Sequence, residues 1–316
     1  MSTLTGALTA AVIAVSGQAH AATLTAEELL SQFNLITTGD VSSTVHVEGR
    51  ALIGGNLSGS FEAQNKNDGG LAPTDFDDLI VVGNQTGTAK VLNNGTLAIG
   101  GTFENVDNLN ANNPERFTNG PDIDVPADFG TVLSDASNAI AGETATNFST
   151  ENNGGQQQSL TTNAVDLAIF EVGTDVFTAQ NTNFEVGSNL ASTNLINVFG
   201  TGVLNITTGF TGGGLDAFAN KSIWNFVGFD ELNFLGSEWF GSILADGALV
   251  TQNSTFNGSV FAQSAIVTGE YHNNGFLGTI PTPSQTPEIS AVPLPAGGLL
   301  LLSGLLGLGL ARRRQR

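Results

Sequence analysis

The chain has 316 residues, with nine lysines and arginines against 29 aspartates and glutamates, and its formal net charge is −20. Such an acidic chain repels phosphate backbones, which argues against nucleic acid and leaves cations and hydrated neutral polysaccharide as partners. It has no cysteine, which excludes disulfides, thiol catalysis and cysteine-based zinc sites.

Residues 1–21 have the features of a signal peptide. An apolar run extends from Ala7 to Val15, and Ala19 and Ala21 supply the small residues that a signal peptidase reads. The pattern predicts cleavage before Ala22, although no lysine or arginine precedes the apolar run. A buried N-terminal helix is the alternative.

The mature chain is predicted to open with a short helix. Thr25-Ala26-Glu27-Glu28 is a capping-box pattern, in which the Thr25 side chain caps the helix and Glu28 reaches back to it. Leu29, Leu30 and Phe33 then fall on one face, which we expect to be buried.

The strongest internal pattern is a repeat with an offset of 17 residues, in which Gly241 to Thr251 matches Gly258 to Thr268. Every apolar position of one copy pairs with an apolar position of the other. A fainter copy with the same offset pairs Val82-Gly83 with Ile99-Gly100. The string from Ile53 to Leu57 also resembles the string from Ile99 to Phe103.

A short period of strand-like residues with Gly and Asn at the turns predicts a mainly β fold, a parallel β-solenoid. In such a fold successive coils stack as parallel strands, equivalent apolar side chains form inward ladders, and alternate polar residues face water. Ile243 and Val260 are then neighbours on one ladder. A β-sandwich with two similar strands is the alternative.

Two segments depart from the strand pattern. Residues 126–141 place Phe129, Val132, Leu133, Ala136 and Ile140 at helical spacing, and this predicts one amphipathic helix flanking the solenoid. Pro126 suits its first turn and Gly142 its end. Residues 144–163 are rich in Asn, Gln, Thr and Gly and are predicted to be a loop or a distorted coil.

Candidate metal ligands are sparse. Two acidic clusters, Asp75, Asp77 and Asp78, and Asp122, Asp124 and Asp128, are weak candidates for Ca²⁺, a cation that prefers oxygen ligands. Solvated turns are the alternative, and we expect no other cofactor.

The histidines offer little more. Once the signal peptide is removed, His46 and His272 remain, too few for a histidine metal centre unless carboxylates join them. His46 lies in an alternating strand and is expected to point outward, and His272 is expected to make a capping hydrogen bond near the last coil.

The C-terminus has a linker followed by three parts in fixed order. Residues 279–291 form a Pro/Thr/Ser linker, and an extended motif follows, made of Val292, Pro293, Leu294, Pro295 and Ala296. An uncharged Leu/Gly run from Gly297 to Ala311 precedes the basic stop, Arg312, Arg313, Arg314 and Arg316. The run is shorter than the roughly 20 residues of an ordinary spanning helix. It still suffices for a thin bilayer with the arginines at the cytoplasmic face.

Residues 292–316 closely resemble the VPLPA variant of the PEP-CTERM sorting signals, over all three parts. The resemblance implies that a membrane enzyme, an exosortase, recognises residues 292–296 and removes the helix. It also implies a Gram-negative host that makes extracellular polysaccharide, with the protein anchored in the inner membrane until it is processed. A plain membrane anchor is the alternative.

The body, residues 22–278, resembles the choice-of-anchor A domain, a family of exported surface domains that is in turn similar to adhesin-like and ice-binding solenoids. The strings that carry the resemblance are Phe33 to Leu35, Val47 to Ala51 with Gly54 to Asn56, Ile223 to Phe226, Gly241 to Ala245, and Gly269 to Asn273 with Phe276. The resemblance implies a solenoid with a flanking helix, and it supports adhesion only by analogy.

Together these patterns predict a non-enzymatic adhesion module of the cell surface or extracellular matrix, associated with exopolysaccharide. A signal peptidase and an exosortase-type enzyme are the expected processing partners. The first alternative is a carbohydrate-active solenoid enzyme, a lyase or hydrolase, but no basic residue forms a recognisable motif with the Asp clusters. The second is an ice-binding protein, which favours flat, regular Thr arrays that the sequence does not show.

Overall fold

The computed structural model describes residues 23–66, 69–107, 116–148, 150–152, 157–179, 182–187, 189–236 and 238–282. The described residues up to Pro281 belong to one compact unit. The predicted signal peptide (1–21), its cleavage site at Ala22 and the sorting signal (292–316) lie outside these ranges. Within them, none of the helices is long and apolar enough to cross a membrane.

The predicted opening helix is confirmed as α1 (Ala26–Gln32). The Thr25 hydroxyl accepts from the Glu28 amide at 3.2 Å, and the Glu28 carboxylate accepts from the Thr25 amide at 2.8 Å. These two bonds satisfy amides that have no partner inside the helix. Leu29, Leu30 and Phe33 are fully buried, as the spacing predicts.

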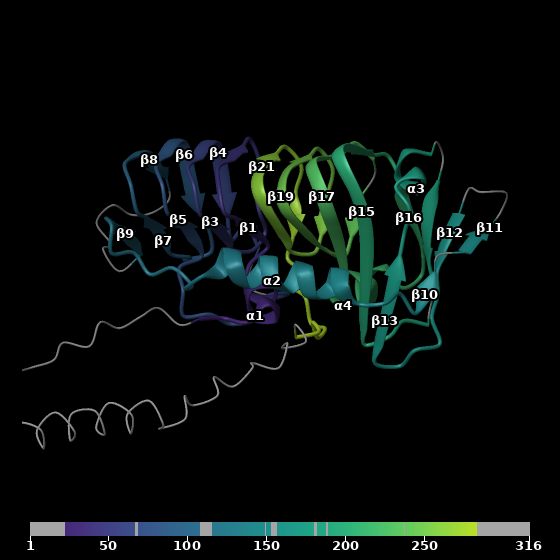
Figure 1. Ribbon diagram of the computed structural model, residues 1–316. Coiled ribbons are helices and arrows are strands. Elements are labelled where there is room, and N and C mark those ends of the chain that lie inside the picture. Colours follow the sequence, from purple (N-terminus) through teal and green to yellow (C-terminus); the bar gives the residue numbers. More distant parts are fainter. Residues whose placement is uncertain are drawn as a thin grey trace, which may run out of the picture. The chain divides into compact units, whose positions relative to one another are not determined.

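The body is a parallel β-solenoid with three faces, which confirms the predicted fold class (Figure 1). The first face is formed, in spatial order, by β10 (Asn147–Phe148), β13 (Leu167–Glu171), the starts of β15 (Thr193–Ile206), β17 (Ser222–Phe234), β19 (Ser242–Gln252) and β21 (Val260–Val267), then β1 (Leu35–Thr37), β3 (Ala51–Ile53), β5 (Leu79–Val81), β7 (Leu97–Ile99) and β9 (Phe117–Asn119).

The second face consists of the ends of β15, β17, β19 and β21 followed by β2 (Val41–Ser43), β4 (Leu57–Ala63), β6 (Gln85–Val91) and β8 (Phe103–Asp107). The third face contains two small sheets. These are β11 (Thr150–Asn152), β12 (Gln157–Leu160), β14 (Asn183–Val186) and β16 (Gly209–Gly212), and then β18 (Trp239–Phe240), β20 (Phe256–Asn257) and β22 (Tyr271–His272).

The chain does not run from one end of the solenoid to the other. It starts in the middle, builds coils outward from β1 to β9, crosses to the far end, and returns from β10 to β21 (Figure 1). The last long strand, β21, then pairs with β1, with Val260 opposite Leu35 and Phe261 opposite Ile36. We call the junction of the last coil with the first the seam.

The 17-residue repeat is confirmed in its first half, since Ile243 pairs with Val260 on adjacent rungs and both are buried. Beyond Ala245 the register shifts, and Thr251 pairs with Ile266, an offset of 15. The corner at Gly247 (φ +79°) is thus two residues longer than the matching corner of β21. A shift of two preserves which side chains face inward, so the sequence similarity survives it.

The fainter copy is wrong by one residue. Ile99 pairs with Val81, an offset of 18, and Val82 is an exposed corner residue. The amide of Gly101 donates to the carbonyl of Gly83 at 2.9 Å, which aligns these two glycines instead. The error arises because Val81 and Val82 are both apolar, and apolar pattern alone does not distinguish them.

A stack of glycines forms the corner between the first and second faces. Gly39, Gly55, Gly83 and Gly101 are joined by amide-to-carbonyl bonds of 2.9–3.0 Å. A Cβ on Gly83 would lie 2.7 Å from the Gly55 carbonyl oxygen, so only glycine fits there. The following side chains, Asp40, Asn56 and Asn84, each accept from the next coil's amide at 2.7–2.9 Å. This corner explains the repeated Gly-Asn strings.

The predicted flanking helix is confirmed as α2 (Phe129–Gly142). It begins at Phe129, three residues after Pro126, with its N-cap residue Asp128 in the left-handed conformation, and it buries Leu133, Ala136 and Ile140 against the first face. Outward side chains of that face, from Ile36 to Phe261, lie beneath α1 and α2 in one apolar cluster. The first face is therefore buried on both sides.

Buried amides attach α2 to the coils. Ser137 donates to Asn225 at 2.6 Å, Asn225 donates back to the Ser137 carbonyl at 2.9 Å, and Asn197 donates to the Ile140 carbonyl at 2.8 Å. Such fully paired polar groups fix the position of the helix, because shifting it would leave them unsatisfied.

The side chains that fill the interior differ between the two ends of the solenoid. Leu, Val, Ile and Ala, together with Phe61, fill the coils from β1 to β9, whereas the returning coils enclose an aromatic cluster around Trp224 and Trp239. Two short helices, α3 (Asp175–Thr178) and α4 (Leu215–Lys221), add Phe177 and Phe218 to that cluster.

Two segments that we predicted to be irregular are ordered into the fold. Strands β10, β11 and β12 lie within the polar region 144–163, where we predicted a loop or distorted coil. In the predicted linker, Ile280 is buried in the cluster under α1, and its amide donates to Glu27 at 2.9 Å. The packed body therefore includes the first residues of the predicted linker.

Candidate functional site

The second face carries no helix within the described residues and presents a straight row of side chains to solvent. Register places seven residues side by side across seven strands, none of them buried: Asn205, Asn233, Thr251, Ile266, Ser42, Ser58 and Thr86. We call these seven the outer row. At about 4.8 Å between strands, the outer row is about 29 Å long.

The outer row is uncharged, although the chain carries a net charge of −20. Six of its members carry a hydroxyl or an amide, and the Asn233 amide donates to the Asn205 side chain at 3.1 Å. A parallel row of Val203, Glu231, Leu249 and Ser264 lies beside it, with Val203 57% exposed. The outer row is thus regular and weakly polar, and the row beside it is partly apolar with one carboxylate, that of Glu231.

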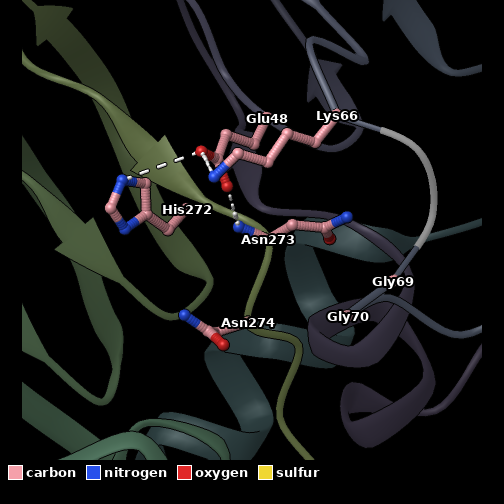
Figure 2. Close-up of a pocket in the computed structure, with 7 residues that line it drawn as sticks. All are labelled: Glu48, Lys66, Gly69, Gly70, His272, Asn273 and Asn274. Atoms are coloured by element: carbon pink, nitrogen blue, oxygen red, sulfur yellow. Dashed lines mark hydrogen bonds and ion pairs between the residues drawn. The ribbon is translucent and has the colours of Figure 1, made fainter. Parts of the chain in front are cut away.

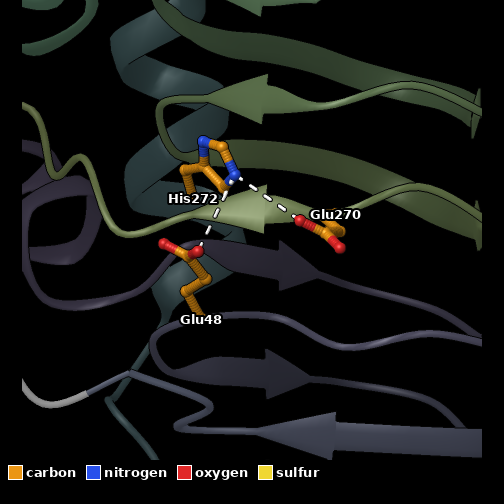
Figure 3. Close-up of side chains that lie close together, drawn as sticks. All are labelled: Glu48, Glu270 and His272. Atoms are coloured by element: carbon orange, nitrogen blue, oxygen red, sulfur yellow. Dashed lines mark ion pairs between the residues drawn. The ribbon is translucent and has the colours of Figure 1, made fainter.

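A second polar site lies on the third face at the seam. Val47 bridges to Tyr271, so Glu48 from the first coil lies beside Glu270 and His272 from the last (Figure 3). The His272 Nε2 atom lies 3.7 Å from a Glu48 oxygen and 3.6 Å from a Glu270 oxygen. His46 Nε2 approaches the other Glu270 oxygen at 3.5 Å.

Glu48 is buried, with 5% of its side chain exposed, and it is held from two sides. Its Oε2 accepts from the Asn273 amide at 3.1 Å, and its Oε1 forms an ion pair with Lys66, whose side chain is 62% exposed. These residues line a hollow of about 290 Å³ together with Gly70 and Asn274 (Figure 2).

The seam also contains buried polar groups without partners. Among the described residues none hydrogen-bonds to the Tyr271 hydroxyl, and burial raises the pKa of that hydroxyl above its usual range. Nor does any described residue pair with the side-chain amide of Asn273, which lines the hollow. In contrast, the His272 ring does have a partner: Nδ1 lies 2.8 Å from the Asn257 side-chain oxygen of the neighbouring coil, a bond between side chains where the sequence predicted a capping hydrogen bond.

The two acidic clusters approach one another but do not form a compact carboxylate set. Asp78 accepts from Arg50 at 2.9 Å and from Gln64 at 2.6 Å, so it belongs to an internal network. Asp75, Asp122 and Asp124 are exposed. The Ca²⁺ site stays a prediction.

One member of these clusters, Asp77, has a carboxyl with a raised pKa. Burial, together with the charges of Asp78 and Asp124, raises the pKa of its carboxyl, and a hydrogen bond from Thr96 opposes the shift. Among these carboxyls, Asp77 thus lies near enough to Asp124 of the other cluster for its charge to contribute.

From the sequence we considered His46 and His272 as candidate ligands but did not identify Glu48 and Glu270. His46 is partly exposed beside the buried Val47, as the alternation predicts. Glu48 should then face solvent or a corner, yet it is buried because the last coil docks over it. The only signal in the sequence was the small number of histidines: His46 and His272 need carboxylates beside them to make a metal site.

A family model described as an ice-binding-like adhesive domain matches residues 26–273. The match covers most of the chain, so the chain belongs to this family of adhesive domains.

Two solved structures are also similar. One is an ice-binding protein from an Antarctic Biological Consortium, with 13% identity over 84% of this chain and 94% of that one, at a TM-score of 0.34. The other is the ice-binding protein LeIBP from an Arctic yeast, with 12% identity over 80% of this chain and 94% of that one, at a TM-score of 0.34. No curated protein matches this chain.

Proposed function

We propose that this protein is a non-enzymatic adhesion module that binds hydrated, neutral polysaccharide through the outer row. The observation that carries the proposal is that helices cover the first face, whereas the second face displays an uncharged row along seven strands that none of the described helices covers. Membership in a family of adhesive domains supports an attachment role.

The chemistry of the outer row suits weak, repeated contact. Hydroxyl and amide side chains donate and accept hydrogen bonds without a charge, so a neutral sugar polymer can exchange its water for them at little cost. Each contact is weak, but six such side chains on one rigid sheet act together, and the effective concentration of each later contact is high. An anionic polymer is repelled by the net charge of −20.

The proposal includes export and display. An adhesive module acts outside the cell, which agrees with the predicted signal peptide (1–21) and with processing of residues 292–316 by an exosortase-type enzyme. A mass spectrum of the protein from its host tests both ends. Loss of residues 1–21 and of the Leu/Gly run is expected, and an intact C-terminal arginine cluster would contradict processing.

The binding proposal is tested by affinity electrophoresis through gels containing a neutral glucan or an anionic polysaccharide. The double variant Ser42→Lys/Thr86→Lys places two bulky charges in the outer row. The matched variant Thr131→Lys/Asn138→Lys places them on the exposed side of α2. Retardation by the neutral glucan should fall at least tenfold in the first variant only. Equal retardation of both variants would remove the outer row from the binding surface.

Ice is the second candidate, because the outer row repeats at the strand spacing, although Thr occupies only two of its seven positions. Recrystallisation inhibition by the protein, lost in Ser42→Lys/Thr86→Lys, would favour ice over polysaccharide. Incubation with polysaccharides, with and without Ca²⁺, tests the enzymatic alternative. New reducing or unsaturated ends would replace the adhesion proposal by a lyase or hydrolase.

A further inference from the structure

The side chains of Glu48, Glu270 and His272 bring three ligand atoms together at the seam. One donor atom from each side chain lies within 4.8 Å of the other two, and no other set of three His, Asp or Glu side chains in the described part of the chain does so. Two of the three come from the last coil and one from the first, so the cluster exists only when the seam is closed (Figure 3).

A hydrogen-bond chain sets the tautomer of His272. The Asn257 side-chain nitrogen donates to Glu238 at 2.8 Å and to the Trp239 carbonyl at 3.1 Å, which orients the Asn257 oxygen toward His272. That oxygen can only accept, so the His272 Nδ1 atom, 2.8 Å away, carries the proton. In the neutral ring Nε2 then presents a lone pair, which is the arrangement of a histidine that ligates a metal.

The distances exclude direct hydrogen bonds in the cluster. A charge-assisted N–H···O bond is about 2.7–2.9 Å long, whereas Nε2 lies 3.6 and 3.7 Å from the two carboxylates. Ligand atoms about 2.0–2.2 Å from a tetrahedral zinc ion are about 3.3–3.6 Å apart. The observed separations of Nε2 from the two carboxylates are therefore close to those of ligands around a shared ion.

We propose that His272 Nε2, Glu48 and Glu270 bind one divalent transition-metal ion of the zinc type, which ties the first coil to the last. Asn257 orients the histidine, and the Asn273 amide holds one Glu48 oxygen, leaving the other for the ion. Glu48 and His272 also line the solvent-open hollow (Figure 2), so water from that side can supply a fourth ligand.

The ammonium group of Lys66 competes with the proposed metal ion for Glu48. It pairs with the Glu48 oxygen that the ion would take, but the Lys66 side chain is 62% exposed and can leave for solvent. His46 flanks Glu270 on the far side. Lys90 is paired with Glu62 at 3.1 Å and does not contact the cluster, so it provides a matched control for Lys66.

The test is a titration of the chelator-treated protein with Zn²⁺ by calorimetry, and with Co²⁺ by visible absorption. One ion should bind per chain, and the Co²⁺ spectrum should show four-coordinate intensity. Glu270→Gln should weaken binding at least tenfold, and because Glu270 is 48% exposed this variant keeps the core intact. Lys66→Met should strengthen binding several-fold, and Lys90→Met should leave it unchanged.

Three results would overturn the proposal. These are the absence of saturable Zn²⁺ binding to the folded protein, unchanged affinity in both Glu270→Gln and His272→Gln, and equal effects of Lys66→Met and Lys90→Met. Circular dichroism of each variant checks that the seam is folded.

Discussion

The solenoid has two arms, the outgoing coils from β1 to β9 and the returning coils from β10 to β21. Replacing Phe261 with alanine tests whether the seam joins these two arms into one folding unit. Phe261 is fully buried, and register places it between Leu244 of the returning arm and Ile36 of the outgoing arm. Truncating a buried phenylalanine costs about 3–5 kcal/mol. In a domain of this size each kcal/mol lowers the unfolding temperature by about 2–4 °C, so we expect a decrease of about 6–20 °C.

Differential scanning calorimetry measures this decrease, with Ile266→Ala on the same strand as the control. Ile266 is 38% exposed, and its truncation should change the free energy of unfolding by less than about 1 kcal/mol. Because each arm packs on the other through β21 and β1, the whole body should unfold at the lowered temperature. If one arm unfolds at its original temperature in Phe261→Ala, the reasoning about the seam is refuted.

Three further variants test local features by urea denaturation. Tyr271→Phe removes a buried hydroxyl for which the described residues offer no partner, and it should stabilise the fold by about 1 kcal/mol; a loss of stability would reveal a partner. Gly83→Ala should destabilise, since its Cβ would meet the Gly55 carbonyl at 2.7 Å, whereas Gly142→Ala, with open space, should not; equal effects would contradict the glycine corner. Asp77→Asn should stabilise the folded state at neutral pH. The pKa of Asp77 is raised above its unfolded value of 3.8, so ionisation of Asp77 destabilises the folded state as the pH rises through the raised pKa. The gain should vanish near pH 3.8, and a gain independent of pH would contradict this cause.

The sequence predicted the parts of the fold that depend on local pattern. The capping box of Thr25, the apolar stripe of α2 and the pairing of Ile243 with Val260 all follow from spacing. The corner lengths did not, because an apolar ladder tolerates extra residues at a corner whenever the inward and outward alternation is kept. The mismatch of Val82 with Ile99 has a different cause: Val81 and Val82 are both apolar, so the apolar pattern alone does not show which of them faces inward.

The sites depend on contacts that no local pattern contains. Glu48 and His272 are 224 positions apart and meet only because β21 returns to β1. The outer row likewise joins Ile266 to Ser42, residues from opposite ends of the body. The sequence could show that Ser42 alternates outward, but not which strands lie beside it.

Hydroxyl-radical footprinting of the protein bound to a neutral polysaccharide tests the adhesion proposal most directly. The exposed aliphatic side chains Ile266 and Val203 lie in and beside the outer row, whereas Val165 and Leu277 are exposed elsewhere. The account predicts that binding lowers the oxidation of Ile266 and Val203 and leaves Val165 and Leu277 unchanged. Protection of Val165 or Leu277, with Ile266 and Val203 still oxidised, would place the adhesive surface on another face.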